Sequence, residues 1–277
     1  MVAKIVGKRL FLMETDWLKL WRELVLAGPP TSSSELAKRY KVHAGKRNER
    51  PDKLLDFILR EIDGETTVLD IGAGSGRWTI PLAKTAKTVT AVEPSNAMVD
   101  NLHRNVASAK LNNIQITQSS WEDAIVEPHD ITVCAHAMYA SPDLASFVRK
   151  IERYTTRTCY LAIRLPPFDG IIGELSLGIY GRYHDSPNAI IAYNALYSIG
   201  IYANMLVESD IYRWTDNTFE EAFARAKRHL RLQSSTTYDT LIRDTLAKRL
   251  SLSNNCYVWP DGMRSALLWW SPSPISS

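Results

Sequence analysis

Short, continuous apolar runs alternate along this chain with stretches whose apolar residues recur every three or four positions. The apolar runs cover residues 66–71, 88–92, 113–117, 130–135 and 158–164. Such runs are typical of parallel strands buried on both faces, and the periodic stretches between them are typical of amphipathic helices. The pattern predicts an α/β fold in which helices cover both faces of a mostly parallel sheet.

The part of the chain before the first run predicts a helical arm. Apolar residues at helical spacing follow Asp16, and Ser32 with Glu35 forms a capping pair that opens a second short helix through Tyr40. We expect this arm to occupy residues 1–50.

The part after the fifth run predicts an insertion followed by a strand pair. Two prolines end the fifth run, and residues 256–259 and 266–270 predict antiparallel strands joined by a turn at 260–262. We expect a single domain over residues 1–277, which divides into the arm (1–50), the core (51–167), a helical insertion between the fifth and sixth strands (168–253) and the strand pair (254–277).

A glycine-rich turn between the first run and the next helix carries the clearest chemical signal. The segment TTVLDIGAGSGRW, residues 66–78, places Gly72, Gly74 and Gly76 directly after a buried strand. Glycines allow positive φ and leave no Cβ in the way, so the backbone amides of this turn can face a ligand. We expect the turn to be a nucleotide cradle.

Charge around the turn indicates which nucleotide it takes. Asp70 stands two residues before the first glycine, where a carboxylate would repel a pyrophosphate but attract an ammonium group. The spacing G-x-G-x-G also differs from the dinucleotide pattern G-x-G-x-x-G. Glu93 follows the second strand, where a carboxylate can accept hydrogen bonds from both ribose hydroxyls. S-adenosylmethionine meets both requirements.

With these residues the sequence resembles the class I S-adenosylmethionine-dependent methyltransferases, most closely a small-molecule, type 11-like branch. The matching segments are VLDIGAGSGRWTIPLA (68–83) and AVEPSNAMVD (91–100). The resemblance implies a Rossmann-like sheet of seven strands with the last strand antiparallel. It also implies S-adenosyl-L-methionine as cofactor and S-adenosyl-L-homocysteine as product.

The resemblance carries cofactor-binding roles over to this chain. In the family, the loop after the third strand contacts the adenine; its common Asp is replaced here by Ser120, so Trp121 and Glu122 are taken as substitutes. The expected cofactor-binding residues are Asp70, Gly72, Ala73, Gly74, Gly76, Glu93, Pro94, Ser120, Trp121, Glu122 and Ala135.

The end of the fourth strand is expected to reach the methyl-transfer centre. His136 is the candidate general base, because imidazole titrates near neutrality, and Tyr139 is the second candidate. His136 could instead only orient the loop or the substrate. The expected substrate-binding residues are Trp17, Trp21, Tyr40, Tyr183 and Tyr197, with ordinary packing as the alternative for each. No metal-ligand set is recognised.

Composition narrows the setting of the protein. Lysine plus arginine exceeds aspartate plus glutamate by 33 − 30 = +3, too little to indicate a nucleic-acid binder. The three cysteines form no C-x-x-C pair, and no signal peptide is recognised, so a cytoplasmic protein with reduced thiols is expected. Residues 189–207 carry no charge but are too polar for a membrane span. We expect a helix there that covers the active site or pairs two subunits as a homodimer.

The sequence therefore predicts a methyltransferase acting on a small molecule. An RNA or protein methyltransferase is the first alternative; the HAMY segment at 136–139 differs from the Asn/Asp-Pro-Pro-Tyr turn of amine methylation. A protein that binds the cofactor without transferring methyl is the second alternative. A nucleotide oxidoreductase is disfavoured by Asp70 and the glycine spacing.

Overall fold

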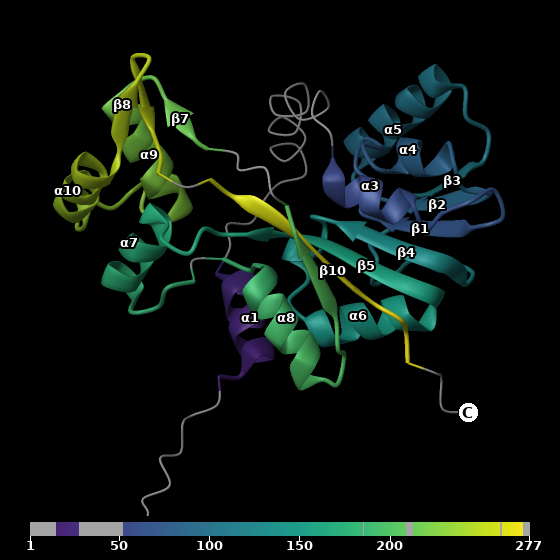
Figure 1. Ribbon diagram of the computed structural model, residues 1–277. Helices are drawn as coiled ribbons and strands as arrows, with labels where there is room; N and C mark the ends of the chain where they lie inside the picture. Colours follow the sequence, from purple (N-terminus) through teal and green to yellow (C-terminus); the bar gives the residue numbers. More distant parts are fainter. Residues whose placement is uncertain (1–14, 28–51, 185, 209–212, 261, 274–277) are drawn as a thin grey trace, which may run out of the picture.

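The computed structural model describes residues 15–27, 52–184, 186–208, 213–260 and 262–273 (Figure 1). The second helix of the predicted arm, with Tyr40, lies outside the described residues.

A sheet of seven strands forms the centre of the protein, in the order β3-β2-β1-β4-β5-β10-β6. Strands β1 to β5 are parallel to their neighbours, whereas β10 is antiparallel to both β5 and β6. The predicted α/β fold with an antiparallel last strand is confirmed. The strands are β1 (Thr67–Ile71), β2 (Thr88–Val92), β3 (Ile114–Thr117), β4 (His129–Ala135), β5 (Thr155–Leu165), β6 (Asn204–Val207) and β10 (Arg264–Trp270).

Helices cover both faces of this sheet (Figure 1). One face carries α3 (Lys53–Leu59), α4 (Thr79–Ala83) and α5 (Asn96–Ala109), and the other carries α1 (Trp17–Leu26), α6 (Leu144–Arg153) and α8 (Ala189–Ser198). In β5, Cys159, Leu161 and Ile163 pack in the core with α1, α6 and α8, while Tyr160 and Ala162 pack in the core with α3 and α4. This alternation explains why the strand reads as one continuous apolar run.

A smaller lobe stands beside the C-terminal end of β5 (Figure 1). It consists of α7 (Ile171–Tyr180), α9 (Phe219–His229), α10 (Asp239–Arg249) and a sheet of β7 (Thr215–Asp216), β9 (Cys256–Val258) and β8 (Ser251–Ser253). The lobe has a hydrophobic core of its own, in which Trp259 packs against the three helices. Thr218 caps the start of α9, since its Oγ1 accepts a hydrogen bond from the Glu221 amide.

The predicted C-terminal strand pair is wrong. Residues 256–258 pair with β7 and β8 in the lobe, whereas 266–270 belong to β10 between β5 and β6. Ala266, Leu267 and Leu268 are consecutive and fully buried, so both faces of β10 need cover. An interior place in the large sheet provides that cover, and a two-stranded hairpin does not.

The uncharged segment 189–207 is not one helix. Helix α8 ends at Ser198, Gly200 follows at φ +81°, and residues 204–207 form β6, the edge strand of the large sheet. The predicted insertion is therefore split, with α7 and α8 before β6 and the rest of the lobe between β6 and β10. Among the described residues, no helix is long and apolar enough to cross a membrane.

Candidate active site

The glycine turn after β1 is closed by tight packing at its first and third glycines. Gly72 has φ +72°, and a Cβ built on it would lie 2.1 Å from the Cβ of Ala137, the residue after His136. A Cβ on Gly76, at φ +94°, would lie 2.6 Å from Leu102 Cδ1 on α5. The turn is thus held against the end of β4 on one side and against α5 on the other.

The second glycine of the turn faces open space. Gly74 has φ +56°, and no atom lies within 4 Å of the position that its Cβ would take. Its amide donates a hydrogen bond of 2.9 Å to Glu93 Oε2. A ligand can therefore approach the backbone at Gly74 while the turn is held in shape by Glu93.

Glu93 is buried and held by two backbone amides. Besides the Gly74 amide on Oε2, the Ser95 amide donates to Oε1 at 2.9 Å. A carboxylate has about four lone-pair sites, so each oxygen keeps one free to accept a further hydrogen bond. The arrangement suits recognition of two neighbouring hydroxyl groups, as the sequence predicts for a ribose.

Asp70 lies at the end of β1 with only 2% of its surface exposed. Thr79 Oγ1 donates a hydrogen bond of 2.6 Å to its Oδ2. Burial raises the pKa of the Asp70 carboxyl to about 6; the Thr79 bond opposes the rise, and the charge of Glu93 adds to it. A cationic ligand group near this carboxyl would therefore favour its ionised form.

Ser95 follows Glu93 and Pro94 and is not among the cofactor-binding residues that the sequence predicts. It does occupy the N-cap position of α5, but its side chain makes no capping bond. Its Oγ is buried and has no hydrogen-bond partner among the described residues. Buried hydroxyls are normally paired, so this one, two residues after Glu93, is available to a bound ligand. Its position two residues after Glu93 was the sequence signal that could have indicated a binding role for Ser95.

The loop after β3, which the sequence predicts to contact the adenine, is held against α6. Trp121 is buried against Phe147 and Tyr154, and its Nε1 donates to the Phe147 carbonyl at 3.2 Å. Ser120 donates to Asp123 Oδ2 at 2.7 Å. The Trp121 ring therefore packs under α6, and its contact with a cofactor stays a prediction.

Glu122 and Lys150 fix the same loop. Glu122 Oε1 accepts a hydrogen bond of 2.8 Å from Ser141 Oγ. From α6, Lys150 Nζ donates to three carbonyl oxygens of the loop, those of Trp121, Glu122 and Ala124, at 2.7, 2.9 and 2.8 Å. Sequence reasoning missed Lys150, because nothing local to it indicates contact with a loop 26 to 29 residues earlier.

His136 and Tyr139 meet beside the glycine turn. His136 has φ +56°, a region that non-glycine residues seldom adopt and that often marks functional sites. Its Nδ1 lies 3.0 Å from the Tyr139 hydroxyl and its Nε2 lies 3.3 Å from Ser265 Oγ. The Arg164 amide donates to the Tyr139 hydroxyl at 2.7 Å. Both predicted catalytic residues thus belong to one hydrogen-bonded group, together with Ser265 and Arg164.

The remaining predicted cofactor residues line the same region. Ala73 is buried within the turn, Ala135 is the last residue of β4, and Pro94 is exposed between Glu93 and Ser95. Their roles stay predictions.

Of the predicted substrate residues that the structure describes, Trp17 and Trp21 lie in one cluster, whereas Tyr183 and Tyr197 lie in other segments. Trp21 is fully buried, its Nε1 donating to the Ser141 carbonyl at 2.9 Å, and Trp17 packs partly buried near it. Tyr197 is 63% exposed on α8. Tyr183 lines a cavity beside the lobe. Tyr40 lies outside the described residues.

The buried cysteines of the sheet are protonated thiols. Burial raises the pKa of Cys134, and that of Cys159 to about 12, so both stay protonated at neutral pH. Within the part of the chain that the structure describes, no group of His, Cys, Asp and Glu side chains could hold a metal ion.

Comparison with known proteins assigns a family to the part of the chain that holds this site. Residues 68–157 match the family described as methyltransferase domain. An uncharacterized protein of Haemophilus influenzae is 26% identical over 239 residues, which cover 83% of this chain and 85% of that protein.

A ribosomal RNA methyltransferase shares a shorter segment. A probable ribosomal RNA small subunit methyltransferase A of Methanosphaera stadtmanae is 34% identical over 92 residues, 31% of this chain and 34% of that protein. This chain therefore spans about a third of the length of that relative.

Among solved structures, the YcgJ protein of Bacillus subtilis has a similar fold. Its TM-score is 0.53 at 17% identity, and the match covers 80% of this chain and 99% of that one.

Proposed function

Because residues 68–157 match a methyltransferase domain, we propose that this chain is a class I S-adenosylmethionine-dependent methyltransferase and that it transfers a methyl group to a small-molecule acceptor. The observation that carries the cofactor part of the proposal is the Glu93 carboxylate, which two backbone amides hold beside the open position at Gly74.

The residues of the turn fit the cofactor of this family. Gly74 leaves space where a Cβ would stand, Ser95 Oγ lacks a partner among the described residues, and Glu93 retains free lone pairs. We assign Glu93 to the ribose hydroxyls, Ser95 to the adenosine and Asp70 to the ammonium group. When bound, S-adenosylmethionine supplies a sulfonium methyl group, whose carbon–sulfur bond breaks as the acceptor's lone pair forms the new bond, leaving S-adenosylhomocysteine.

The chain's own contribution to the reaction is position and proton removal. Holding two reactants in line can supply much of the rate advantage, because it replaces a bimolecular encounter. If the acceptor atom carries a proton, we propose that the group of His136 and Tyr139 receives it, which the hydrogen bond between the two side chains supports. In that role the imidazole of His136 must be neutral before the transfer.

An RNA acceptor is the second candidate, since a relative acts on ribosomal RNA. That likeness covers 31% of this chain. The choice of acceptor by the present protein is expected to depend on the residues outside this matched segment, above all on the lobe. The small-molecule proposal rests on the cavity at that lobe.

Calorimetric titration with S-adenosylmethionine and NADH tests the cofactor assignment. We expect the protein to bind the first at micromolar concentration and not the second. Glu93→Gln should weaken binding at least tenfold, because an amide group cannot accept hydrogen bonds on both sides, so the Gly74 or the Ser95 amide loses its acceptor. Glu65→Gln is the matched control, since Glu65 is exposed and lies before β1. NADH binding, or equal effects of the two variants, would refute the assignment.

Transfer of a labelled methyl group then separates the two acceptor classes. Small-molecule extract and total RNA are incubated in parallel with the protein and labelled S-adenosylmethionine. Label in the acid-soluble products, absent with Glu93→Gln, supports the proposal. Label confined to precipitated RNA would favour the second candidate, and cofactor binding without transfer to either would favour a non-catalytic binding protein.

A cytoplasmic location and a homodimer also belong to this proposal. Cys134, Cys159 and Cys256 are free thiols, as expected in a reducing compartment. Tyr193 and Tyr197 are exposed on α8 and Tyr202 follows on the same side of the chain, which offers a face for a second subunit. Sedimentation of a monomer at micromolar concentration would exclude the dimer.

A further inference from the structure

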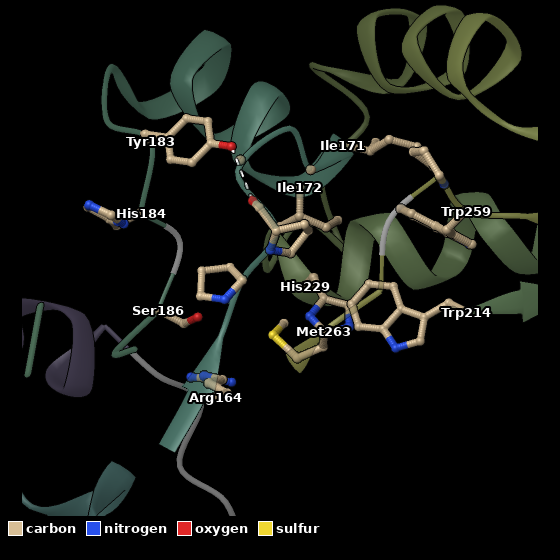
Figure 2. Close-up of a pocket in the computed structure, with 15 residues that line it drawn as sticks. Arg164, Ile171, Ile172, Tyr183, His184, Ser186, Trp214, His229, Trp259 and Met263 are labelled. Atoms are coloured by element: carbon tan, nitrogen blue, oxygen red, sulfur yellow. Dashed lines mark hydrogen bonds between the residues drawn. The ribbon is translucent and has the colours of Figure 1, made fainter. Parts of the chain in front are cut away.

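A cavity of about 50 Å³ lies between the end of the large sheet and the lobe (Figure 2). Its lining comes from the end of β5, from α7, from the segment around Tyr183 and His184, and from lobe residues that include Trp214 and Trp259. Because a cavity of about 150 Å³ encloses benzene, this one encloses only part of a small molecule.

The aromatic wall of the cavity is held in place before any ligand binds. Trp214 stacks on His229 at 4.7 Å between ring centroids and meets Trp259 edge-on at 5.4 Å. Trp259 Nε1 donates to Asp216 Oδ2 at 2.8 Å, and that carboxylate is paired with Arg225. Such a preformed wall favours a ligand with a flat, apolar part, since little side-chain ordering is left for binding.

Arg164 brings a positive charge to the cavity. It stands at the lower edge in Figure 2, and none of the described residues that line the cavity is acidic. Arg164 Nε donates to the Pro187 carbonyl at 2.8 Å, and its guanidinium lies 4.6 Å from the centre of the Tyr139 ring. Among the described residues it pairs with no carboxylate, whereas Arg225 and Arg249 in the lobe each do. Its two terminal nitrogens can therefore receive the carboxylate of a ligand, a geometry that arginine favours.

The cavity is joined to the methyl-transfer region by direct contacts. The Arg164 amide bonds to the Tyr139 hydroxyl, which lies 3.0 Å from His136 Nδ1. The next residue, Ala137, packs against Gly72 of the cofactor turn. A ligand group bound to Arg164 would therefore lie near Tyr139 and His136, the group proposed to accept the proton.

We propose that this cavity binds the methyl acceptor, and that the acceptor is a small carboxylate with a flat, apolar body, its carboxylate paired with Arg164. The inference rests on the proposed function and names the substrate class for that site. Arg164 acts here as a specificity-determining residue.

Measuring the affinity of the protein for three probes of similar size tests this proposal without turnover. Benzoate, benzamide and benzylamine share a phenyl ring, and their substituents carry charges of −1, 0 and +1. Each probe is titrated with and without S-adenosylhomocysteine. We expect benzoate to bind at least tenfold more tightly than the other two. The tryptophan indole N–H signal that Trp214→Phe removes should shift on addition of benzoate, which places the probe in this cavity.

Variants on one strand provide the control. Arg164→Gln should abolish the preference for benzoate, Arg164→Lys should keep part of it, and neither should change the S-adenosylmethionine affinity more than twofold. Arg157→Gln, exposed near the opposite end of β5, should leave the preference intact. A preference for benzylamine, a preference that survives Arg164→Gln, or benzoate binding that leaves the Trp214 signal unmoved would overturn the inference. Failure of S-adenosylhomocysteine to bind would instead refute the proposed function. The titrations without S-adenosylhomocysteine still report whether benzoate binds, so the two failures can be told apart.

Discussion

Asp70 is the residue in which folding and ligand binding have opposite requirements. Burial of its carboxyl disfavours the charged form and raises the pKa from the ordinary value of 3.8 to about 6. The folded protein therefore holds a proton on Asp70 where the unfolded chain has lost it. The resulting stabilisation is fully present below about pH 4 and is lost as the pH rises through about 6. The charged form that remains above pH 6 is the one that an ammonium group needs.

We expect Asp70→Asn to stabilise the ligand-free protein at pH 8 by about 3 kcal/mol, the equivalent of about two pKa units. Asparagine stays neutral at every pH, and its oxygen can still accept the Thr79 hydrogen bond. The gain should shrink as the pH falls toward 4. Urea denaturation of both proteins at pH 4, 6 and 8 measures the difference.

The same substitution should weaken S-adenosylmethionine binding at pH 8 at least tenfold, and the affinity of the unmodified protein should fall below pH 6. Asp130→Asn is the contrasting variant, because hydrogen bonds from the Thr67 amide and hydroxyl lower the pKa of Asp130. It should lose stability at neutral pH and keep the affinity. Loss of stability in Asp70→Asn at pH 8 would contradict this account.

Among the elements, α6 determines the shape of the loop that follows β3. From that helix, Lys150 Nζ donates hydrogen bonds to three loop carbonyls. The same ammonium nitrogen lies 4.7 Å from the centre of the Trp121 ring. Burial lowers the pKa of its ammonium group, and the nearby Glu122 opposes this effect. The loop is thus positioned by a helix that is later in the chain.

We expect Lys150→Met to cost about 1–3 kcal/mol of stability, since the three carbonyls lose a charged donor while the apolar stem is kept. Amide hydrogen exchange should rise at residues 121–124, and S-adenosylmethionine should bind several-fold more weakly. Arg153→Met, exposed on the same helix, is the matched control. Unchanged exchange at the loop in Lys150→Met would show that other contacts hold it.

On the scale of the whole molecule, the protein consists of a cofactor-binding sheet and a lobe with a separate core. The lobe core contains Leu246 and Ile242 from α10, together with Phe223 from α9, and it shares no residue with the clusters of the large sheet. Cooperative units of this kind can open independently. The acceptor cavity lies between the two parts, whereas the cofactor turn lies within one of them.

We expect Leu246→Ala to destabilise the lobe by about 2–5 kcal/mol, because it opens a hole at a fully buried position. Hydrogen exchange should rise in α9 and α10 while β1 to β5 stay protected, and S-adenosylhomocysteine should still bind. Leu82→Ala, equally buried on α4 in the sheet core, should instead weaken that binding. Equal loss of cofactor binding in both variants would show that the two parts unfold as one.

The sequence by itself determined the cofactor turn. A strand of β-branched and apolar residues, three glycines and an acid after the next strand specify their structure through local backbone preferences and through the edge at which parallel strands end. The structure accordingly places Asp70, Gly74 and Glu93 together. The alternation of apolar runs and helical periods likewise determined the α/β class.

Only the tertiary structure decided which strand pairs with which, and where long side chains point. Residues 204–207 and 264–270 became neighbours in the large sheet because their apolar faces find cover there, a choice that depends on partners far along the chain. Trp121 turned into the core for the same reason. The contacts of Lys150 with its loop and of Arg164 with the cavity join residues distant in sequence, so no local pattern could indicate them.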